Sequence, residues 1–384
     1  MFMNSKRILF DSSTADINHQ GGGSLAVLAY LNAVLEIFPN KVDVITPTEL
    51  NIRDGRFNSL DVDKRTTKDR KRGFLQGKFY RSAEYIVNYV KKNHNKYEWI
   101  FLNGGLHSGY TVSKLKKLGI KIVVFHHNYE PEYQMGSKSI ISFKGRTDFW
   151  VKVWERKAYR YCNANLFISQ EDKELFEKAY GKRDDNYFIG IYEPRRVDIE
   201  KPKEGFEKSM AITCSLCAYQ NLLSLRRFKE HFLQTFHNTL PDWQLKIMGR
   251  NPSKEILDWE KEYAFVKIYP SPENIRELCS QSPIYLCQMD DGGGLKLRVM
   301  DGLRNGQPIL THKVSARGYN AFFNEPFFNV YDDEESFVRG LKEITEYVKS
   351  DEFSKEYVQK RYYEEFGFDI GIERLKNILH QIEY

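Results

Sequence analysis

Three consecutive glycines at 292–294 are the feature of this sequence that points most directly to chemistry. They follow an apolar run at 283–288 and precede a helical pattern over 295–304. Glycines let the backbone approach a ligand closely, and the free N–H groups of a helix N-terminus bind anions. Lys296 and Arg298 fall in the predicted first turn, where a cation opposes the helix dipole, so they favour an anionic ligand. A tight turn without a ligand is the alternative. The predicted contacts are Gly292, Gly293, Gly294, Leu295, Lys296 and Arg298.

A second polar group follows the apolar run 120–126. His126, His127 and Asn128 lie at the carboxyl end of this predicted strand, where parallel α/β sheets place ligands. Adjacent residues of a strand point to opposite faces, so we expect His127 to face the site and His126 to pack into the sheet. If the strand register is off by one residue, His126 is the candidate instead. The same alternation disfavours a metal site built on both histidines. Glu130 is either a ligand contact or an ordinary surface carboxylate.

Alternating strand and helix patterns surround these two groups and predict two doubly wound α/β domains. Helical patterns cover 24–38, 79–92, 151–161 and 333–384, the last with a break near 366–369. A polar segment with two prolines, 194–208, is the predicted linker. The predicted strands are 7–12, 42–46, 99–103, 120–126, 164–169, 187–191, 210–216, 244–249, 265–269, 284–288, 309–312 and 327–330.

Composition limits the class of protein. The chain has 384 residues and no apolar run of membrane-spanning length or signal peptide, so we expect a cytoplasmic protein. The five cysteines lack a disulfide or zinc spacing, and Cys214-x-x-Cys217 is expected to supply buried thiols.

Residues 1–197 contain 33 Lys and Arg against 22 Asp and Glu, whereas the remainder is slightly acidic. The basic half favours a polyanion or an anionic membrane as its partner, with an ordinary solvated surface as the alternative.

The basic charge is densest after a stretch without clear periodicity, 48–77. Arg70, Lys71 and Arg72 lie here among aromatic and apolar residues. Such a mixture suits an anionic membrane surface, which basic side chains attract and aromatic ones enter. Single-stranded nucleic acid and a solvated loop without a partner are the alternatives. We favour the membrane and expect no nucleic acid partner.

The segment 283–318 resembles the donor-nucleotide segment of GT-B glycosyltransferases, particularly the retaining family 4. The matching residues are Gly292–Gly294, Lys296, Asp301, Gly306, Pro308, Ile309–Thr311 and Gly318. The family often has a His-Asn pair near the transferred sugar, which His127-Asn128 matches, and a glycine turn beside the diphosphate, here 21–23 with Gly22 and Gly23. The resemblance implies two Rossmann-like domains facing a cleft, 1–197 on the acceptor side and 198–368 on the donor side. It also implies a final helix, 369–384, that returns to the first domain.

Two departures from the family pattern affect the expected roles. Family members often have two glutamates eight positions apart; the second place is Asp301, which could bind the ribose, and the first is Gly293. Asp290 or Asp291 could substitute there, or backbone N–H groups could suffice. The Arg and Lys that often grip the diphosphate are absent from 213–221, and Arg250 is a candidate replacement.

The sequence therefore predicts a glycosyltransferase that uses a nucleotide-diphosphate sugar and, by resemblance, retains the anomeric configuration. The expected acceptor is a glycan or lipid-diphosphate-linked glycan of a bacterial surface polysaccharide, at the inner face of the cell membrane. No metal or other cofactor is expected. A GT-B-like sugar-nucleotide 2-epimerase and a basic nucleic-acid-binding protein are the alternative functions.

Overall fold

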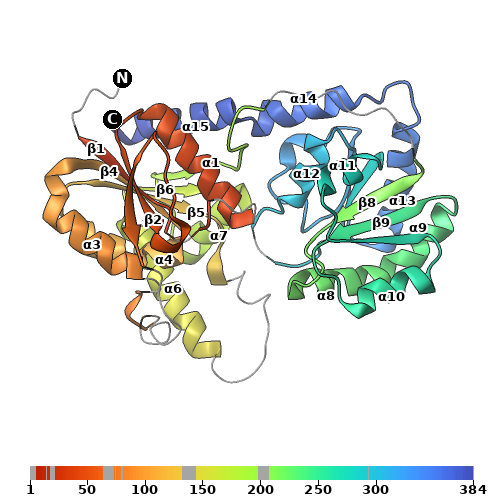
Figure 1. Ribbon diagram of the computed structural model, residues 1–384, viewed down its shortest axis with the longest axis horizontal. Helices are drawn as coiled ribbons and strands as arrows, with labels where there is room; N and C mark the ends of the chain where they lie inside the picture. Colours follow the sequence, from red (N-terminus) through yellow and green to blue (C-terminus); the bar gives the residue numbers. More distant parts are fainter. Residues whose placement is uncertain are drawn as a thin grey trace. The chain divides into compact units, whose positions relative to one another are not determined.

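The chain folds into two compact units, one of residues 1–196 and 366–384 and the other of residues 197–365 (Figure 1). The structure is a computed structural model. It describes residues 6–13, 15–17, 22–63, 73, 75–78, 81–131, 144–197, 207–292 and 294–383. The predicted contacts Gly293, Arg70, Lys71 and Arg72 lie outside these residues, as does Gly21 and most of the predicted linker.

The first unit is built on a seven-stranded, wholly parallel sheet with the order β3-β2-β1-β4-β5-β6-β7. Its central strands are apolar and buried on both faces, as expected for a sheet covered by helices. The strands are β1 (Arg7–Asp11), β2 (Val42–Pro47), β3 (Asn58–Val62), β4 (Tyr97–Asn103), β5 (Lys121–His126), β6 (Ala164–Phe167) and β7 (Asn186–Phe188). The helices are α1 (Gly22–Ile37), α3 (Arg81–Asn93), α4 (Gly105–Leu115), α6 (Lys144–Tyr161), α7 (Gln170–Tyr180) and α15 (Phe368–Glu383).

The second unit repeats this plan with a six-stranded parallel sheet of order β10-β9-β8-β11-β12-β13. Its strands are β8 (Ser209–Thr213), β9 (Gln244–Gly249), β10 (Val266–Pro270), β11 (Ile284–Cys287), β12 (Ile309–His312) and β13 (Phe328–Tyr331). Its helices are α8 (Tyr219–Phe228), α9 (Gln234–Thr239), α10 (Lys254–Glu262), α11 (Ile275–Ser280), α12 (Arg298–Arg304), α13 (Glu334–Tyr347) and α14 (Lys355–Phe366). The predicted fold class, two doubly wound α/β domains, is confirmed by the strand order and parallel pairing of both sheets.

The strand order of each sheet locates its ligand-binding edge. In both sheets the first three strands are added in order toward one edge. The next strand then lies on the opposite side of the first strand, and the following strands are added toward the other edge. Ligands of such sheets bind beyond the carboxyl ends of the two strands where the direction reverses. Those strands are β1 and β4 in the first unit and β8 and β11 in the second.

Three sequence predictions about the elements are wrong. The segment 48–77 contains β3, which pairs in parallel with β2; its sequence alternates polar and apolar residues too weakly to be recognised. Gly22 and Gly23 are the first two residues of α1 and not part of a preceding turn. Cys217 is exposed in the turn after β8, whereas Cys214 is buried as expected.

Helix α15 packs on α1, far from it in sequence (Figure 1). Gly371 makes the approach possible, because a Cβ atom at this position would lie 2.2 Å from the ring of Tyr192. Arg196 holds the same region with ion pairs to Asp369 at 2.7 Å and Glu36 at 3.2 Å. Residues 366–384 therefore complete the core of the first unit.

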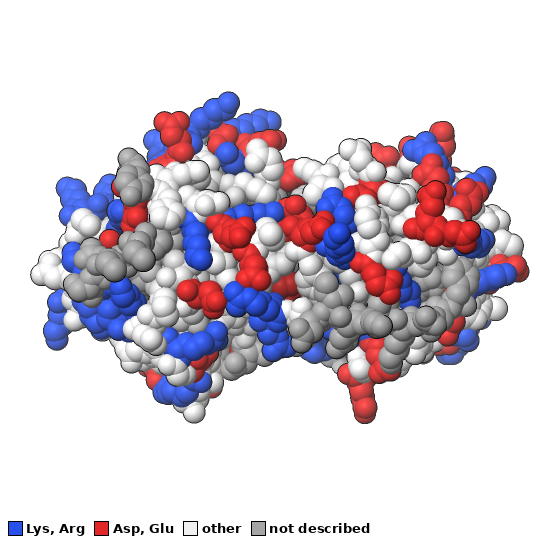
Figure 2. Space-filling model, turned by 90° about the horizontal axis from the view of Figure 1, so that it is seen from above, with Lys and Arg blue, Asp and Glu red and all other residues white. Residues whose placement is uncertain are grey.

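Charged side chains of both signs are interspersed over the face in Figure 2, so this face does not form a continuous basic surface. Within the described residues, no helix is long and apolar enough to cross a membrane.

One fully buried carboxylate, Asp43 on β2, has three close donors around it and a fourth, Asn58 Nδ2, at 3.4 Å. Arg7 Nε and Lys96 Nζ each lie 2.8 Å from a carboxylate oxygen, and the Tyr97 hydroxyl lies 2.5 Å from one. Burial alone would raise the pKa of Asp43, but these hydrogen bonds lower it below its usual value.

We predict that Asp43→Asn lowers the free energy of unfolding by about 2 kcal/mol. This loss is smaller than the loss expected when a wholly buried ion pair is broken, because Arg7 and Lys96 keep some contact with water. Since the folded-state pKa of Asp43 is depressed, its contribution is present at neutral pH and declines as pH falls below roughly 4. Chemical denaturation at pH 7 and pH 3 measures the difference. Asp258→Asn, at an exposed pair with Lys261, is the control, and an equal loss in both variants would contradict the prediction.

Candidate functional site

Three residues at the ends of adjacent strands form one hydrogen-bonded chain in the first unit. Asp11 ends β1, Asn103 ends β4 and His127 directly follows β5. The Asn103 Nδ2 group donates to the backbone carbonyl of Asp11 at 2.7 Å, and His127 Nε2 lies 3.3 Å from Asn103 Oδ1. The carboxyl edge at the β1–β4 reversal is therefore lined by interacting polar groups.

This chain determines which nitrogen of His127 carries the proton. Because the amide nitrogen of Asn103 already donates to Asp11, its oxygen must accept, and His127 Nε2 must donate. The lone pair of His127 then resides on Nδ1, a buried atom without a hydrogen-bond partner among the described residues. Burial, assisted by nearby His107, lowers the pKa of His127 to about 4. His127 is thus a neutral imidazole at pH 7 that offers an acceptor.

His126 points to the other face of β5 and has a different environment. Its ring stacks on Phe167 and meets the edge of Phe176, and its Nε2 lies 2.8 Å from Asn165 Oδ1. The side chain is 1% exposed. Burial lowers the pKa of His126 to about 3. His126 is packed within the core, whereas Phe125 and His127 share the face that contacts Tyr30 of α1.

Two buried carboxylates fix the backbone that follows His127. The N–H of Tyr129 donates to Asp172 Oδ1 at 3.1 Å, and the N–H of Glu130 donates to Glu155 Oε1 at 3.0 Å. Tyr180 donates its hydroxyl to the other Glu155 oxygen at 2.8 Å. Glu155 is fully buried, and this burial raises its pKa well above the usual value. Asn128 is half-buried and directly precedes these anchored residues.

In the second unit the glycine-rich loop joins β11 to α12 and is held at several points. Gly292 and Gly294 have φ values of +88° and +71°, which L side chains rarely adopt. Lys296 Nζ donates to the Gly292 carbonyl at 2.8 Å, and the Tyr319 hydroxyl donates to the Lys296 carbonyl at 2.9 Å. Ser315 Oγ donates to the Met289 carbonyl at 2.5 Å. These bonds tie the carbonyl groups of Met289, Gly292 and Lys296 to side chains of the same unit.

The predicted helix start at Leu295 is wrong, because α12 begins at Arg298. Lys296 and the half-buried Leu295 lie in the loop before the helix. The physical reason is that the positive φ of Gly294 and the bond from Tyr319 turn the backbone away from helical geometry here. An argument from the helix dipole accordingly does not apply to Lys296, whose ammonium instead closes the loop on itself.

Asp290, considered as a replacement for the missing glutamate, is occupied by other groups. Arg227 of α8 binds both of its carboxylate oxygens, with Nη2 2.5 Å from Oδ1, and Ser224 Oγ donates to Oδ1 at 2.6 Å. Asp291 Oδ1 accepts from the N–H of Gly292 at 2.6 Å. Arg227, at 36% side-chain exposure, brings to this loop a cation that the sequence analysis missed.

Asp301 is ion-paired on both sides within α12. Arg298 lies 3.0 Å from Oδ2 and Arg304 lies 3.2 Å from Oδ1. Burial raises the pKa of Cys214, the residue after β8, to about 12, and the charge of Arg298 partly offsets this rise. Arg250 is exposed after β9, and its carbonyl accepts from the N–H of Leu216 at 3.1 Å. Arg298 and Asp301 both lie on α12, which packs on β11, one of the two strands at the reversal.

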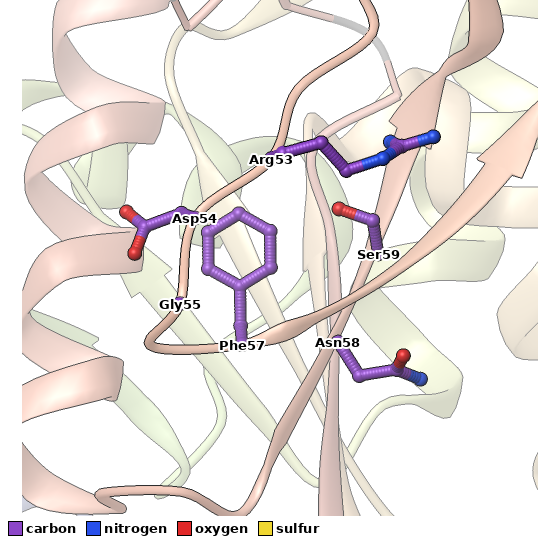
Figure 3. Close-up of a pocket in the computed structure, with 6 residues that line it drawn as sticks. All are labelled: Arg53, Asp54, Gly55, Phe57, Asn58 and Ser59. Carbon is purple, nitrogen blue, oxygen red and sulfur yellow. The ribbon is translucent and has the colours of Figure 1, made fainter.

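A separate open pocket of about 460 Å³ lies at the amino end of β3 (Figure 3). It is lined by Arg53, Asp54, Gly55, Phe57, Asn58 and Ser59. Arg53 pairs with Asp61, and Asp54 pairs with Arg56. Because ligands of parallel sheets bind at the carboxyl ends of strands, this pocket is not the candidate site.

Sequence analysis missed Asp11, Asn103, Glu155, Asp172 and Arg227. A usable signal existed for the first two, which are polar residues at the ends of predicted strands. Nothing local marks the other three, whose partners are 25 to 63 residues away in the sequence.

The chain matches no family model and no curated protein, but many solved structures are similar to it. Sucrose-phosphate synthase from Thermosynechococcus elongatus has a TM-score of 0.70 and 13% identity, covering 98% of this chain and 99% of that one. HepE from Anabaena in complex with UDP has a TM-score of 0.66 and 12% identity, over 98% and 100%. The lipopolysaccharide outer core galactosyltransferase WaaB has a TM-score of 0.65 and 13% identity, over 98% and 99%. This chain therefore has the fold of these GT-B proteins over almost its entire length.

We predict that the imidazole of His127 stays in its neutral, Nε2-protonated form from pH 8 down to about pH 5, because its pKa is lowered to about 4. In Asn103→Leu the acceptor for that proton is lost, and the preference for one tautomer should disappear. Nitrogen chemical shifts from NMR measure both. His126, bonded to Asn165, is the internal control and should not change. An Nδ1-protonated His127 in the unmodified protein would contradict the assignment.

Proposed function

We propose that this protein transfers a glycosyl group from a nucleoside diphosphate sugar to a hydroxyl group of an acceptor. The observation that carries the proposal is the glycine-rich loop at the β8–β11 reversal, pre-shaped and accompanied by Lys296 and Arg298, in a chain with the fold of GT-B glycosyltransferases. Breaking the bond to the diphosphate leaves negative charge on the leaving group, which fixed cations and N–H groups stabilise.

The donor diphosphate is assigned to the loop 292–297. Lys296 would give up or share its bond to the Gly292 carbonyl and contact a phosphate oxygen, while the Gly292–Gly294 backbone permits close approach. Asp301 would accept hydrogen bonds from the ribose while Arg304 keeps its carboxylate in place. Arg250 and Arg227 are further cations near the strand ends. HepE structures contain UDP and UDP-glucose, which makes UDP the first nucleotide to test.

The sugar is assigned to His127 and its neighbours. A neutral imidazole whose free lone pair lies on Nδ1 accepts a hydrogen bond from a sugar hydroxyl without adding charge. Asn128 could supply a further amide contact, and Glu130 a carboxylate for the acceptor. Gly22 and Gly23 lie at the start of α1, and Gly23 would leave space beside the ligand, since a Cβ atom there would meet no atom within 4 Å. No metal or other cofactor is needed for these roles.

We further propose that the anomeric configuration is retained, and that the acceptor is a lipid-diphosphate-linked glycan of a surface polysaccharide. Peripheral contact with an anionic membrane is supported by lysines that lie over aromatic rings in the first unit. Lys78 and Lys114 lie over the ring of Tyr110 at 5.3 and 5.8 Å, and Lys157 lies over Trp154 at 3.7 Å. Leu75 nearby in sequence is 55% exposed.

Thermal unfolding with a panel of nucleoside diphosphates and their sugars tests the class, because a ligand that binds the folded state raises the midpoint. NMR of the nucleotide sugar then separates the possible reactions. Release of nucleoside diphosphate with transfer of the sugar supports a transferase, and a change at carbon 2 of an intact nucleotide sugar supports an epimerase. No response to any nucleotide, together with salt-dependent binding of an oligonucleotide, would overturn both.

We expect Lys296→Ala to lower turnover roughly 10²-fold, as for loss of one group that stabilises developing charge. Steady-state kinetics with a saturating donor measure this. Lys313→Ala is the matched control, since Lys313 pairs with Asp332 on the surface of the same unit, and it should leave turnover unchanged. Normal turnover in Lys296→Ala would remove this residue from the site.

Replacing Arg70, Lys71 and Arg72 with Ser should weaken binding to anionic vesicles by about 1 kcal/mol per charge. Hydrolysis of the donor in solution should be preserved. Co-sedimentation with vesicles containing phosphatidylglycerol measures binding, and vesicles of phosphatidylcholine alone are the control. Equal binding of both proteins would exclude this segment as a membrane contact.

A further inference from the structure

Asp11 is a buried carboxylate for which the proposed donor and sugar contacts give no role. It ends β1, the central strand at the reversal of the first sheet, and is 7% exposed. Burial raises its pKa, although hydrogen bonds from Ser13 oppose the rise. Burying a carboxylate costs free energy unless hydrogen-bond donors satisfy its oxygens. We therefore asked which donors each oxygen of Asp11 has.

Only one of the two oxygens of Asp11 is satisfied within the described part of the chain. Oδ1 accepts from the N–H of Ser13 at 3.0 Å and from its hydroxyl at 2.5 Å. These bonds form a local turn and fix the direction of the carboxylate. Oδ2 has no donor among the described residues, although the Asp11 side chain is not wholly closed off from the surface. The turn therefore accounts for Oδ1 and leaves Oδ2 available.

The groups around Asp11 indicate what this oxygen could bind. The Asn103 amide links the Asp11 backbone to His127, so Oδ2 and the free Nδ1 of His127 belong to one edge of the sheet. Both are acceptors, and no Lys or Arg among the described residues contacts the carboxylate. Two acceptors without a cation suit a neutral, hydroxyl-rich group and disfavour a phosphate.

We propose that Asp11 Oδ2, oriented by Ser13, is the hydrogen-bond acceptor for a hydroxyl of the acceptor substrate, and that the part of that substrate bound here is an uncharged sugar. This inference rests on the proposed function. It names one residue of the acceptor subsite and predicts that the group bound there is uncharged. Any phosphate or diphosphate of the acceptor must then lie away from the end of β1.

The test compares Asp11→Asn with the unmodified protein at pH 8. The Asn side chain can still accept from Ser13 through its oxygen, but it presents an NH₂ group in place of Oδ2. Saturation-transfer NMR in the presence of UDP measures binding of methyl α-glucoside, methyl α-galactoside and their 6-phosphates. We expect the unmodified protein to bind a neutral glycoside at least tenfold more tightly than its phosphate. In Asp11→Asn this preference should largely disappear, while UDP affinity by calorimetry is retained.

Asp61→Asn is the control, since Asp61 is an ion-paired carboxylate on β3 of the same unit, and it should keep the preference. If Asp11→Asn does not fold, Asp11→Ser, which is smaller and equally neutral, replaces it in the same comparison. An unchanged preference in the neutral variant, or no preference in the unmodified protein, overturns the inference. Failure of the proposed function would appear differently, as an absence of UDP binding in every variant.

Discussion

The side-chain amide of Asn103 is the interaction on which the candidate site of the first unit depends. An amide can donate from one end and accept at the other, and here both ends are used, toward Asp11 and His127. The ends of three strands are thereby joined across the sheet. The same two bonds set the proton position of His127 and leave its lone pair on the buried Nδ1. A carboxylate at 103 could not donate, and an apolar side chain could do neither.

In both units, side chains fix the backbone of the loop at the carboxyl end of a strand, but the two units use different groups. In the first, buried carboxylates anchor the backbone after β5 through successive N–H groups. In the second, an ion pair between Asp290 and Arg227 and the ammonium of Lys296 shape the loop after β11. Both arrangements cost side-chain entropy during folding and not when a ligand arrives, which is the advantage of a preorganised site.

The sequence predicted the fold well because buried parallel strands are continuous apolar runs that are visible locally. The strand 309–312 was predicted with its observed bounds, and the break before α15 was also located. The edge strand β3 was missed because most of its residues are polar and only Val62 is buried. The helix start after the glycines was misplaced because Tyr319, 23 residues away, holds the Lys296 carbonyl. Contacts of this kind leave no periodic signal.

The dependence of the first unit on residues 366–384 has a consequence for how the protein is made. Gly371 lies against the ring of Tyr192, so α15 covers a part of the core that the preceding 196 residues cannot close by themselves. During synthesis the second unit, which is continuous in sequence, emerges whole before this helix does. The first unit to begin translation is therefore the last to be completed, and until then its exposed apolar surface must be shielded by other means.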